Sequence, residues 1–198
     1  MKKIKIMTAI TSLNPIIDKK GKREISLETF HKLYDNREDD YKYEWHNGIV
    51  EKTPRTMNRS QLLIVQRLTR LFLQTIAFKQ MGELEREVKM FLPKANRTRV
   101  ADLAFLTAEG VKEQDDIRPS LSEFVIEIIS KNDKANDIQE KLEEYFADGV
   151  KVVWHIFPKM NLVEVYTSPD SVTICRGATI CSAFPVLLDF EIAAQDIF

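Results

Sequence analysis

Three charged residues stand in stretches of sequence that are otherwise apolar: Asp102, Glu127 and Lys141. Glu127 lies within the run 124–129, whose apolar residues occupy both alternating positions and therefore predict a strand buried on both faces. Asp102 lies in a second predicted strand, 99–106, beside apolar residues of the same face. A carboxylate in such a position is costly unless it is paired, protonated or bound to a metal.

The chemistry that these residue types support is metal-assisted hydrolysis. Two carboxylates on neighbouring strands repel each other unless a cation lies between them, and oxygen ligands suit Mg²⁺ or Mn²⁺. A metal at Asp102 and Glu127 could lower the pKa of a water and neutralise a phosphate oxygen. Lys141, predicted on the inner edge of the following helix, adds a positive charge for the attacking group. These are the minimum parts for hydrolysing a phosphodiester.

Glu127 and Lys141 also have a purely structural interpretation. Glu127 could be a core carboxylate that is hydrogen-bonded to Lys141 or Tyr145. Lys141 could instead extend along its helix to water.

The same alternative holds for Asp102, which could be an acid at a strand edge paired with Arg99 or Lys89. The histidines satisfy no ligand spacing and are predicted to be structural (His31, His46 and His155).

The elements that must position these residues follow from periodicity and turn signals. We expect a short helix over 27–34, a long helix from Asn58 to about 81, and a helix that follows the turn 130–133 and ends at Gly149. Hairpins are predicted over 41–52, 84–106 and 162–175, a polar loop over 108–120, and a short strand with a helical turn in the tail 179–198. Strands 124–129 and 150–157 are joined by the third helix through short links. This arrangement makes a right-handed crossover, so the two strands should be parallel.

Length and composition predict one domain over 25–198 after an N-terminal arm over 1–24. Hydrophobic content is 44%, yet no apolar run approaches the roughly 20 residues that span a bilayer, and no secretory signal is evident. Cys175 and Cys181 are predicted to be reduced packing residues, which favours a cytoplasmic protein. The chain has no P-loop and no G-x-G-x-x-G motif, so no nucleotide cofactor is expected.

Charge is distributed unevenly along the chain. Residues 52–99 contain eleven Lys or Arg and three Glu, whereas residues 100–149 contain five Lys or Arg and thirteen Asp or Glu. This pattern suits a polyanion held beside a carboxylate cluster that binds a cation, or, alternatively, two solvated faces of a neutral protein. The predicted contacts to DNA backbone phosphates are Lys52, Arg55, Arg59 and Arg67.

Four runs in the same order and spacing resemble the Uma-type family of restriction endonucleases, a branch of the PD-(D/E)XK nuclease superfamily. They are YEWHNGIVE (43–51), RVADLAFL (99–106), FVIEIISKND (124–133) and EKLEEYFADGVKVVWHIFP (140–158). The resemblance extends from the helix at 27–34 to beyond Tyr166.

The resemblance implies an α/β (α+β) fold, with a restriction-endonuclease-like mixed central sheet flanked by helices and with β-hairpins. It implies that Asp102 and Glu127 hold Mg²⁺ or Mn²⁺, that Lys141 is catalytic, and that Glu44 assists. The implied partner is DNA, and the implied assembly is a homodimer. Glu44 could equally be a surface residue of its hairpin.

The chain departs from the family pattern at three places. Ile129 stands where the superfamily has a lysine, Ala101 stands where proline is usual, and residues 58–61 lack the histidine that often begins the first long helix. Three hypotheses therefore remain: a Mg²⁺-dependent DNA endonuclease, a catalytically inactive nuclease fold that serves as a DNA-binding or interaction module, or a subunit whose exposed hairpins mainly form a homodimer.

Overall fold

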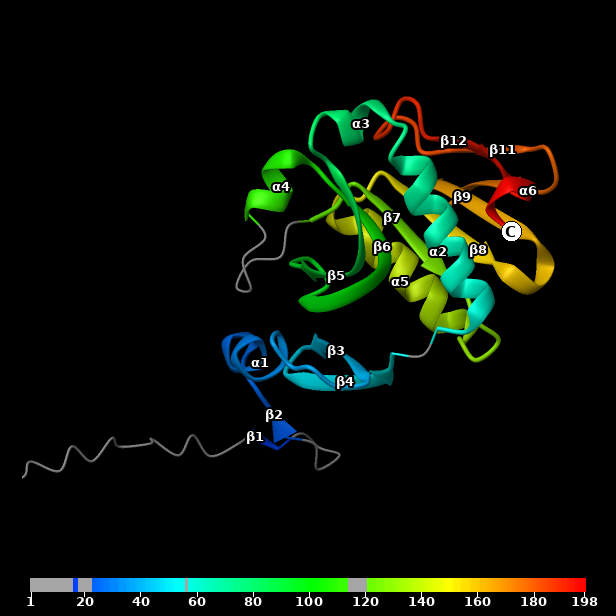
Figure 1. Cartoon of the computed structure of the whole chain (residues 1–198). Helices are drawn as coiled ribbons and strands as arrows, with labels where there is room; N and C mark the ends of the chain where they lie inside the picture. The colour runs from blue at the N-terminus through cyan, green and yellow to red at the C-terminus, as the bar shows by residue number, and fades with distance from the viewer. Residues whose placement is uncertain (1–15, 18–22, 56, 114–120) are drawn as a thin grey trace, which may run out of the picture.

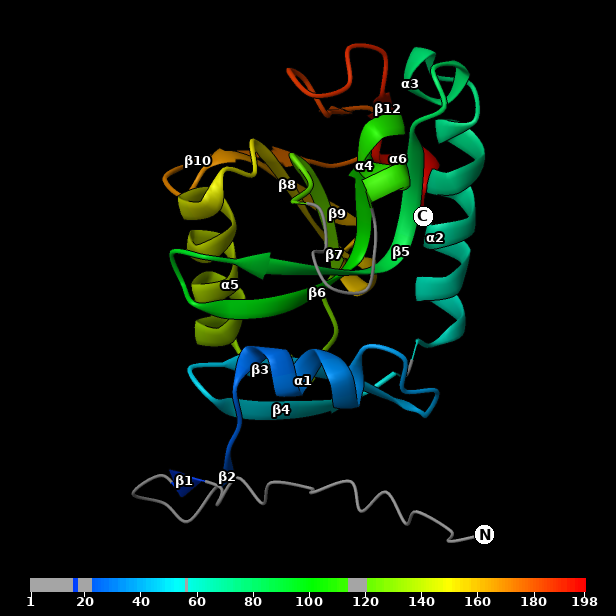
Figure 2. The ribbon, with the colours of Figure 1, turned by 90° about the vertical axis from the view of Figure 1, so that its left-hand side faces the viewer.

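A mixed β-sheet lies between helices in the computed structural model, which describes residues 16–17, 23–55, 57–113 and 121–198. Figure 2 shows α5 on one face of the sheet and α2 on the other, and Figures 1 and 2 show α1 against the β3–β4 hairpin. The strands are β1 (Ile16–Ile17), β2 (Arg23–Glu24), β3 (Tyr41–His46), β4 (Ile49–Pro54), β5 (Glu83–Leu92), β6 (Arg97–Leu106), β7 (Phe124–Ile128), β8 (Val152–Phe157), β9 (Leu162–Ser168), β10 (Ser171–Cys175), β11 (Ile180–Ser182) and β12 (Glu191–Ala193). The helices are α1 (Leu27–Tyr34), α2 (Arg59–Phe72), α3 (Ile76–Lys79), α4 (Ala108–Glu113), α5 (Ala135–Asp148), the 3₁₀ turn η1 (Pro158–Met160) and α6 (Ala194–Ile197).

The main sheet has eight strands in the order β10-β9-β8-β7-β6-β3-β4, with β5 paired to β6 outside this path. β7 and β8 are parallel, as predicted for strands joined by α5, and the other pairs of this sheet are antiparallel. The predicted fold class, a mixed sheet flanked by helices and built partly from hairpins, is therefore confirmed.

β6 has two unlike edges. One edge pairs with β5 from Arg97 to Leu106. The other edge is shared by β3 and β7. β3 forms a single pair with it, His46 with Arg97, and the pairing with β7 begins at Leu103. A stretch of backbone between these two ladders therefore needs partners other than a strand.

Three apolar clusters hold the layers together. The cluster between the sheet and α2 also takes in the C-terminal segment, where Trp154 stacks on Phe190 with ring centroids 5.6 Å apart. The cluster under α5 includes Leu142 and Tyr145, and the cluster under α1 contains Phe30. Each cluster joins elements that are distant in sequence, so helix faces are fixed by the strands they cover.

The predicted helix from Asn58 to about 81 is in fact two helices. Asn58 begins α2 with a capping box to Gln61, as expected, but α2 ends at Phe72. The hydroxyl of Thr75 donates to the carbonyl of Phe72 (2.7 Å) and accepts from the amide of Phe78 (3.1 Å). Thr75 thus closes one helix and caps the next, a role that a hydrophobic stripe does not reveal.

Gly82 ends this helical region for a packing reason. Met81, not Gly82, adopts the left-handed backbone conformation, with φ of 66°. A Cβ on Gly82 would lie 2.8 Å from Cε2 of Phe105, so glycine allows β5 to begin against that ring.

Other parts of the chain differ less from expectation. The predicted polar loop 108–120 begins with α4, and residues 114–120 lie outside the described residues, as does most of the predicted arm 1–24. Cys175 and Cys181 are free and buried, which confirms their interpretation as reduced packing residues. Within the described ranges, none of the helices is both long enough and apolar enough to cross a membrane.

Glu87 interrupts the middle of β5. Its φ of 54° is left-handed, while Arg86 pairs with Leu103 and Val88 pairs with Ala101 on either side of it. This conformation costs an L-residue roughly 1–2 kcal/mol, whereas glycine adopts it freely.

We therefore predict that Glu87→Gly is more stable than Glu87→Ala by about 1 kcal/mol, although both variants lack the carboxylate. Urea unfolding of the two variants measures the difference. Equal stabilities would contradict the left-handed backbone at this position.

Candidate active site

The candidate site fills the gap between β3 and β7 along β6. The amide of Val100 donates to Oε1 of Glu44 (2.8 Å), and its carbonyl accepts from Nζ of Lys141 (3.2 Å). Farther along, Oδ2 of Asp102 accepts from the amide of Ile128 (2.8 Å). Side chains thus bond backbone groups that a continuous strand would otherwise satisfy.

Glu127 and Lys141 form a buried ion pair. Nζ of Lys141 lies 2.8 Å from Oε1 of Glu127, and the hydroxyl of Tyr145 donates to the same oxygen at 2.7 Å. The glutamate side chain is 9% exposed and that of Lys141 is 19% exposed. Glu127 therefore has both partners that its structural interpretation named, and they occupy one of its two oxygens.

The pKa values of this pair are shifted by burial and by nearby charges. Burial raises the pKa of Glu127, the charge of Lys141 opposes this, and the negative charge of Asp102 adds to the increase. Burial alone would lower the pKa of Lys141, but the carboxylates of Glu127, Glu44 and Asp102 outweigh it and raise the pKa. Lys141 is therefore an ammonium donor at neutral pH and not a base.

Asp102 stands directly opposite Glu127. The antiparallel pairs Leu103 with Ile126 and Ala104 with Val125 set this register, and one further step brings Asp102 level with Glu127. The closeness of the two carboxylates is also the reason that Asp102 raises the pKa of Glu127.

The cation that binds Asp102 is one that the sequence analysis missed. Nζ of Lys42 on β3 lies 2.7 Å from Oδ1 of Asp102. Neither predicted partner takes this place, since Lys89 pairs with Asp35 and Arg99 pairs with carboxylates on β3 and α5. The available signal was that Lys42 precedes Glu44 by two residues and so shares its face of the strand.

Glu44 is held at the site by Arg99. Its Oε2 lies 3.1 Å from Nη1 of Arg99, whose Nε donates to Oε2 of Glu144 on α5 at 2.6 Å. Burial alone would raise the pKa of Glu44, but the positive charges of Lys141 and Arg99 outweigh it and hold the pKa below its usual value. The glutamate stays ionised, and Arg99 joins β3, β6 and α5 by pairing with both Glu44 and Glu144.

Part of the basic segment 52–99 is internal. Arg97 and Arg99 are each 5% exposed, and Nη2 of Arg97 lies 2.6 Å from Glu51. Lys89 is likewise paired with Asp35. The excess of positive charge in this segment therefore does not amount to one continuous basic face.

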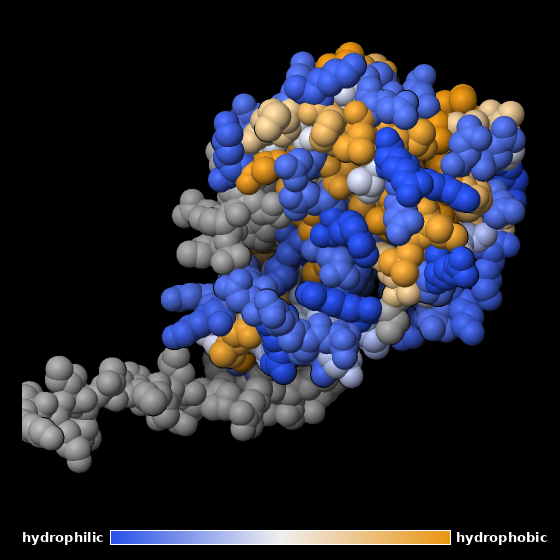
Figure 3. Space-filling model, in the orientation of Figure 1, coloured by the Kyte–Doolittle hydropathy of each residue, from blue (hydrophilic) through white to orange (hydrophobic). Residues whose placement is uncertain are grey.

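The predicted DNA-contacting residues lie in different surroundings. Nζ of Lys52 lies 3.4 Å from the ring centroid of Tyr41, Nε of Arg55 lies 3.5 Å from Glu87, and Arg59 is exposed at the start of α2. Arg67 donates to the carbonyl of Ile197 at 3.3 Å. Figure 3 shows hydrophilic side chains over the junction between the β3–β4 hairpin and the rest of the structure.

His155 borders the carboxylates on the other side. It is paired in register with Glu127, and its ring contacts that of Tyr166 with centroids 5.1 Å apart. Burial and, secondarily, the charge of Lys141 lower the pKa of His155 to about 4, so the imidazole is neutral. The sequence predicted a structural role for His155 but did not predict its position beside Glu127.

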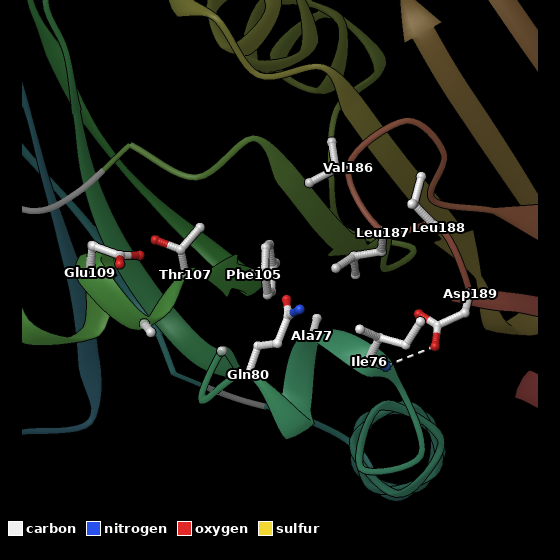
Figure 4. A pocket seen from close by; sticks show the side chains of 12 residues that line it. Ile76, Ala77, Gln80, Phe105, Thr107, Glu109, Val186, Leu187, Leu188 and Asp189 are labelled. Atoms are coloured by element: carbon white, nitrogen blue, oxygen red, sulfur yellow. Dashed lines mark hydrogen bonds between the residues drawn. The ribbon is translucent and has the colours of Figure 1, made fainter.

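A separate hollow of about 490 Å³ lies at the opposite end of β6, with Phe105, Leu187 and Ile76 in its wall (Figure 4). Asp189 at its rim accepts a hydrogen bond from the amide of Ile76 (2.7 Å), which caps α3. None of the residues lining this hollow belongs to the carboxylate cluster. Within residues 23–55, 57–113 and 121–198, no three His, Cys, Asp or Glu side chains converge closely enough to enclose a metal ion.

Comparison with known proteins supports the resemblance seen in the sequence. The sequence profile of the Uma2 family, described as "Putative restriction endonuclease", matches residues 27–195. The chain therefore belongs to this family. None of the curated proteins matches it.

The fold also matches a solved structure. The crystal structure of a putative nuclease belonging to DUF820 from Anabaena variabilis ATCC 29413 aligns with a TM-score of 0.72 and 14% sequence identity. The alignment covers 88% of this chain and 97% of that one. At this identity the likeness establishes a shared fold.

The neutral imidazole of His155 leads to a pH-dependent stability. Its folded pKa of about 4 lies below the usual 6.5, so the unfolded chain binds more protons as the pH falls through this window, and stability decreases. Between pH 7 and pH 5 this group should remove about 2 kcal/mol.

Replacing the imidazole tests this expectation. His155→Leu should lose about 2 kcal/mol less than wild type when urea unfolding is compared at pH 7 and pH 5. The same loss in both proteins would contradict a buried neutral histidine.

Proposed function

We propose that this protein hydrolyses phosphodiester bonds in DNA with the help of Mg²⁺ or Mn²⁺. The observation that carries this proposal is the placement of Asp102 opposite Glu127, with the ammonium of Lys141 on Glu127 at 2.8 Å. Membership of the Uma2 family, which is described as "Putative restriction endonuclease", supports the same reaction class.

The donor set fits a hard divalent cation. The two facing side chains offer carboxylate oxygens, and both already attract positively charged groups, Lys42 to Asp102 and Lys141 to Glu127. Mg²⁺ usually takes one or two protein carboxylates and completes its shell with waters and phosphate oxygens, so a third acidic side chain is not required. Asp102 and Glu127 would hold the metal, with Glu127 free to use Oε2 because Lys141 and Tyr145 share Oε1.

The chain's own residues have distinct tasks in this proposal. When bound, the metal supplies charge neutralisation at a phosphate oxygen and a lower pKa for a water. Lys141 keeps its proton and donates to the charge that develops on the phosphate. Tyr145 fixes the orientation of Glu127, and Glu44, held by Arg99, helps to keep Lys141 charged through its negative charge.

Substrate contacts are proposed for the hairpin and the start of α2. Lys52 lies in β4, Arg55 directly follows that strand, Arg59 is the first residue of α2, and all three are exposed. Such side chains would contact backbone phosphates and set the position of the duplex. Arg67 already binds a backbone carbonyl of the C-terminal helix and is expected to contribute less.

Cleavage assays test the catalytic assignment. With Mg²⁺ or Mn²⁺, Asp102→Asn and Lys141→Met should each reduce the rate of nicking of plasmid DNA by about 100-fold or more, because each removes charge stabilisation that the reaction needs. Lys151→Met is a matched control, since Lys151 forms an exposed pair with Glu123 at 2.6 Å outside the site. Unchanged nicking in both site variants would refute the assignment.

The alternative is an inactive nuclease fold that binds DNA. It is favoured by one observation: both oxygens of Asp102 are already occupied, Oδ1 by Lys42 and Oδ2 by the amide of Ile128. In this case the charged cluster is structural, and no variant should cleave DNA.

Binding measurements address the substrate contacts in either case. The logarithm of the affinity for a short duplex should fall linearly with the logarithm of salt concentration, and Arg55→Ala should reduce the slope by about 1. Arg67→Ala should reduce the slope less than Arg55→Ala does. Fluorescence anisotropy without divalent metal measures both slopes, and equal slopes for wild type and Arg55→Ala would exclude Arg55 from the interface.

A further inference from the structure

Three carboxylates lie abreast on β5, β6 and β7. Asp102 faces Glu127 on one side through the register of β6 with β7. On the other side it faces Glu87, because the flanking pairs Arg86 with Leu103 and Val88 with Ala101 leave Glu87 level with Asp102. Glu87 is the residue whose left-handed backbone interrupts β5. The candidate site therefore has an acidic neighbour that its predicted chemistry does not use.

The ammonium of Lys42 lies between two of these carboxylates. Its Nζ is 2.7 Å from Oδ1 of Asp102 and 4.0 Å from Oε1 of Glu87. The other oxygen of Glu87 lies 3.5 Å from Nε of Arg55. The side chains of Lys42 and Asp102 are only 16% and 14% exposed, so water screens their interaction little. One lysine thus has a near carboxylate and a more distant one.

A metal ion at Asp102 would need the place that Lys42 holds. An ammonium and a divalent cation at Oδ1 would compete for the lone pairs of one oxygen and would repel each other, so a bound metal favours departure of the ammonium. The backbone of Lys42 is paired with Thr53 of β4 and not with β6, whose ladder with β3 is the single pair of His46 with Arg97, so it is the side chain of Lys42 that would move. Glu87 offers the ammonium a second partner on the adjacent strand.

We propose that Lys42 is an internal cation that occupies Asp102 in the absence of metal, and that Glu87 accepts its ammonium when a divalent cation binds. This inference rests on the proposed metal site at Asp102 and Glu127. Lys42 and Glu87 are positioning residues: they act on the metal through Asp102. The proposal also gives a reason for glutamate at a backbone position where glycine would be less strained.

The proposal predicts the opposite sign for two charge changes. Removing the competing ammonium with Lys42→Met should tighten Mn²⁺ binding by roughly tenfold, a coupling of ordinary size between two linked binding events. Glu87→Gln should weaken Mn²⁺ binding in the wild-type background, because the ammonium then has no negatively charged second partner. In the Lys42→Met background the same substitution should have little effect.

Mn²⁺ binding to the full-length protein without DNA measures these effects, with free Mn²⁺ followed by electron paramagnetic resonance. Lys151→Met is the matched control, since Lys151 forms an exposed pair with Glu123 at 2.6 Å outside the site. It removes the same charge without touching Asp102, and it should change affinity less than twofold. If Lys42→Met does not fold, as judged by circular dichroism, Lys42→Gln takes its place.

The outcomes separate this inference from the proposed function. If Asp102→Asn abolishes Mn²⁺ binding but loss of Lys42 leaves the affinity unchanged or weaker, the metal site stands and the role of Lys42 is refuted. If Glu87→Gln weakens binding equally with and without Lys42, Glu87 acts on the metal directly and its role as acceptor is refuted. If wild type binds no Mn²⁺, or binds it as well as Asp102→Asn does, both the metal site and this inference are overturned.

Discussion

The incomplete pairing of β6 is the constraint on which the site depends. Along β6, pairing with β3 is limited to Arg97 and pairing with β7 begins at Leu103. The backbone of β6 between these two residues must therefore be bonded by other groups on this edge. Glu44 and Lys141 bond the amide and the carbonyl of Val100. Since an unbonded buried backbone group costs about 1–3 kcal/mol, charged side chains at this gap are part of the fold as well as candidates for chemistry. This is why ionised residues occur inside an otherwise apolar sheet.

The charges at the gap are balanced by partners from separate elements. Glu44 and Glu127 are both shielded from water, yet the pKa of Glu44 is lowered while that of Glu127 is raised. Their neighbours explain the difference, because Glu44 adjoins Arg99 and Lys141, whereas Glu127 adjoins Asp102 as well as Lys141. The same ion pairs join the β3–β4 hairpin and α5 to β6. The neighbours that set these pKa values therefore also fix the positions of the elements that carry the groups.

Sequence reasoning found the residues whose surroundings are locally unusual. Asp102 and Glu127 could be identified because a carboxylate in an apolar strand breaks a local rule, and Lys141 because of its position on the helix. Lys42 and Glu87 were missed, since Lys42 belongs to the polar positions that alternate with aromatic residues in a hairpin, and Glu87 lies in a half-exposed strand with interleaved charges, where a charge is ordinary. Arg97 and Arg99 were assigned to a basic segment, although their burial against acids of β3, β4 and α5 could not be read from that segment.

By itself the sequence determined the class of fold, most helices and strands, the parallel crossover through α5, and three charged residues that now lie around one gap. These follow from periodicity, turn residues and the high cost of a buried charge, all of which act locally along the chain. Only the tertiary structure decided which cation binds which carboxylate, where β6 loses its strand partner, and that Glu87 stands level with Asp102. Those facts depend on the register between strands that are far apart in sequence, and a shift of register by one residue would change every one of them.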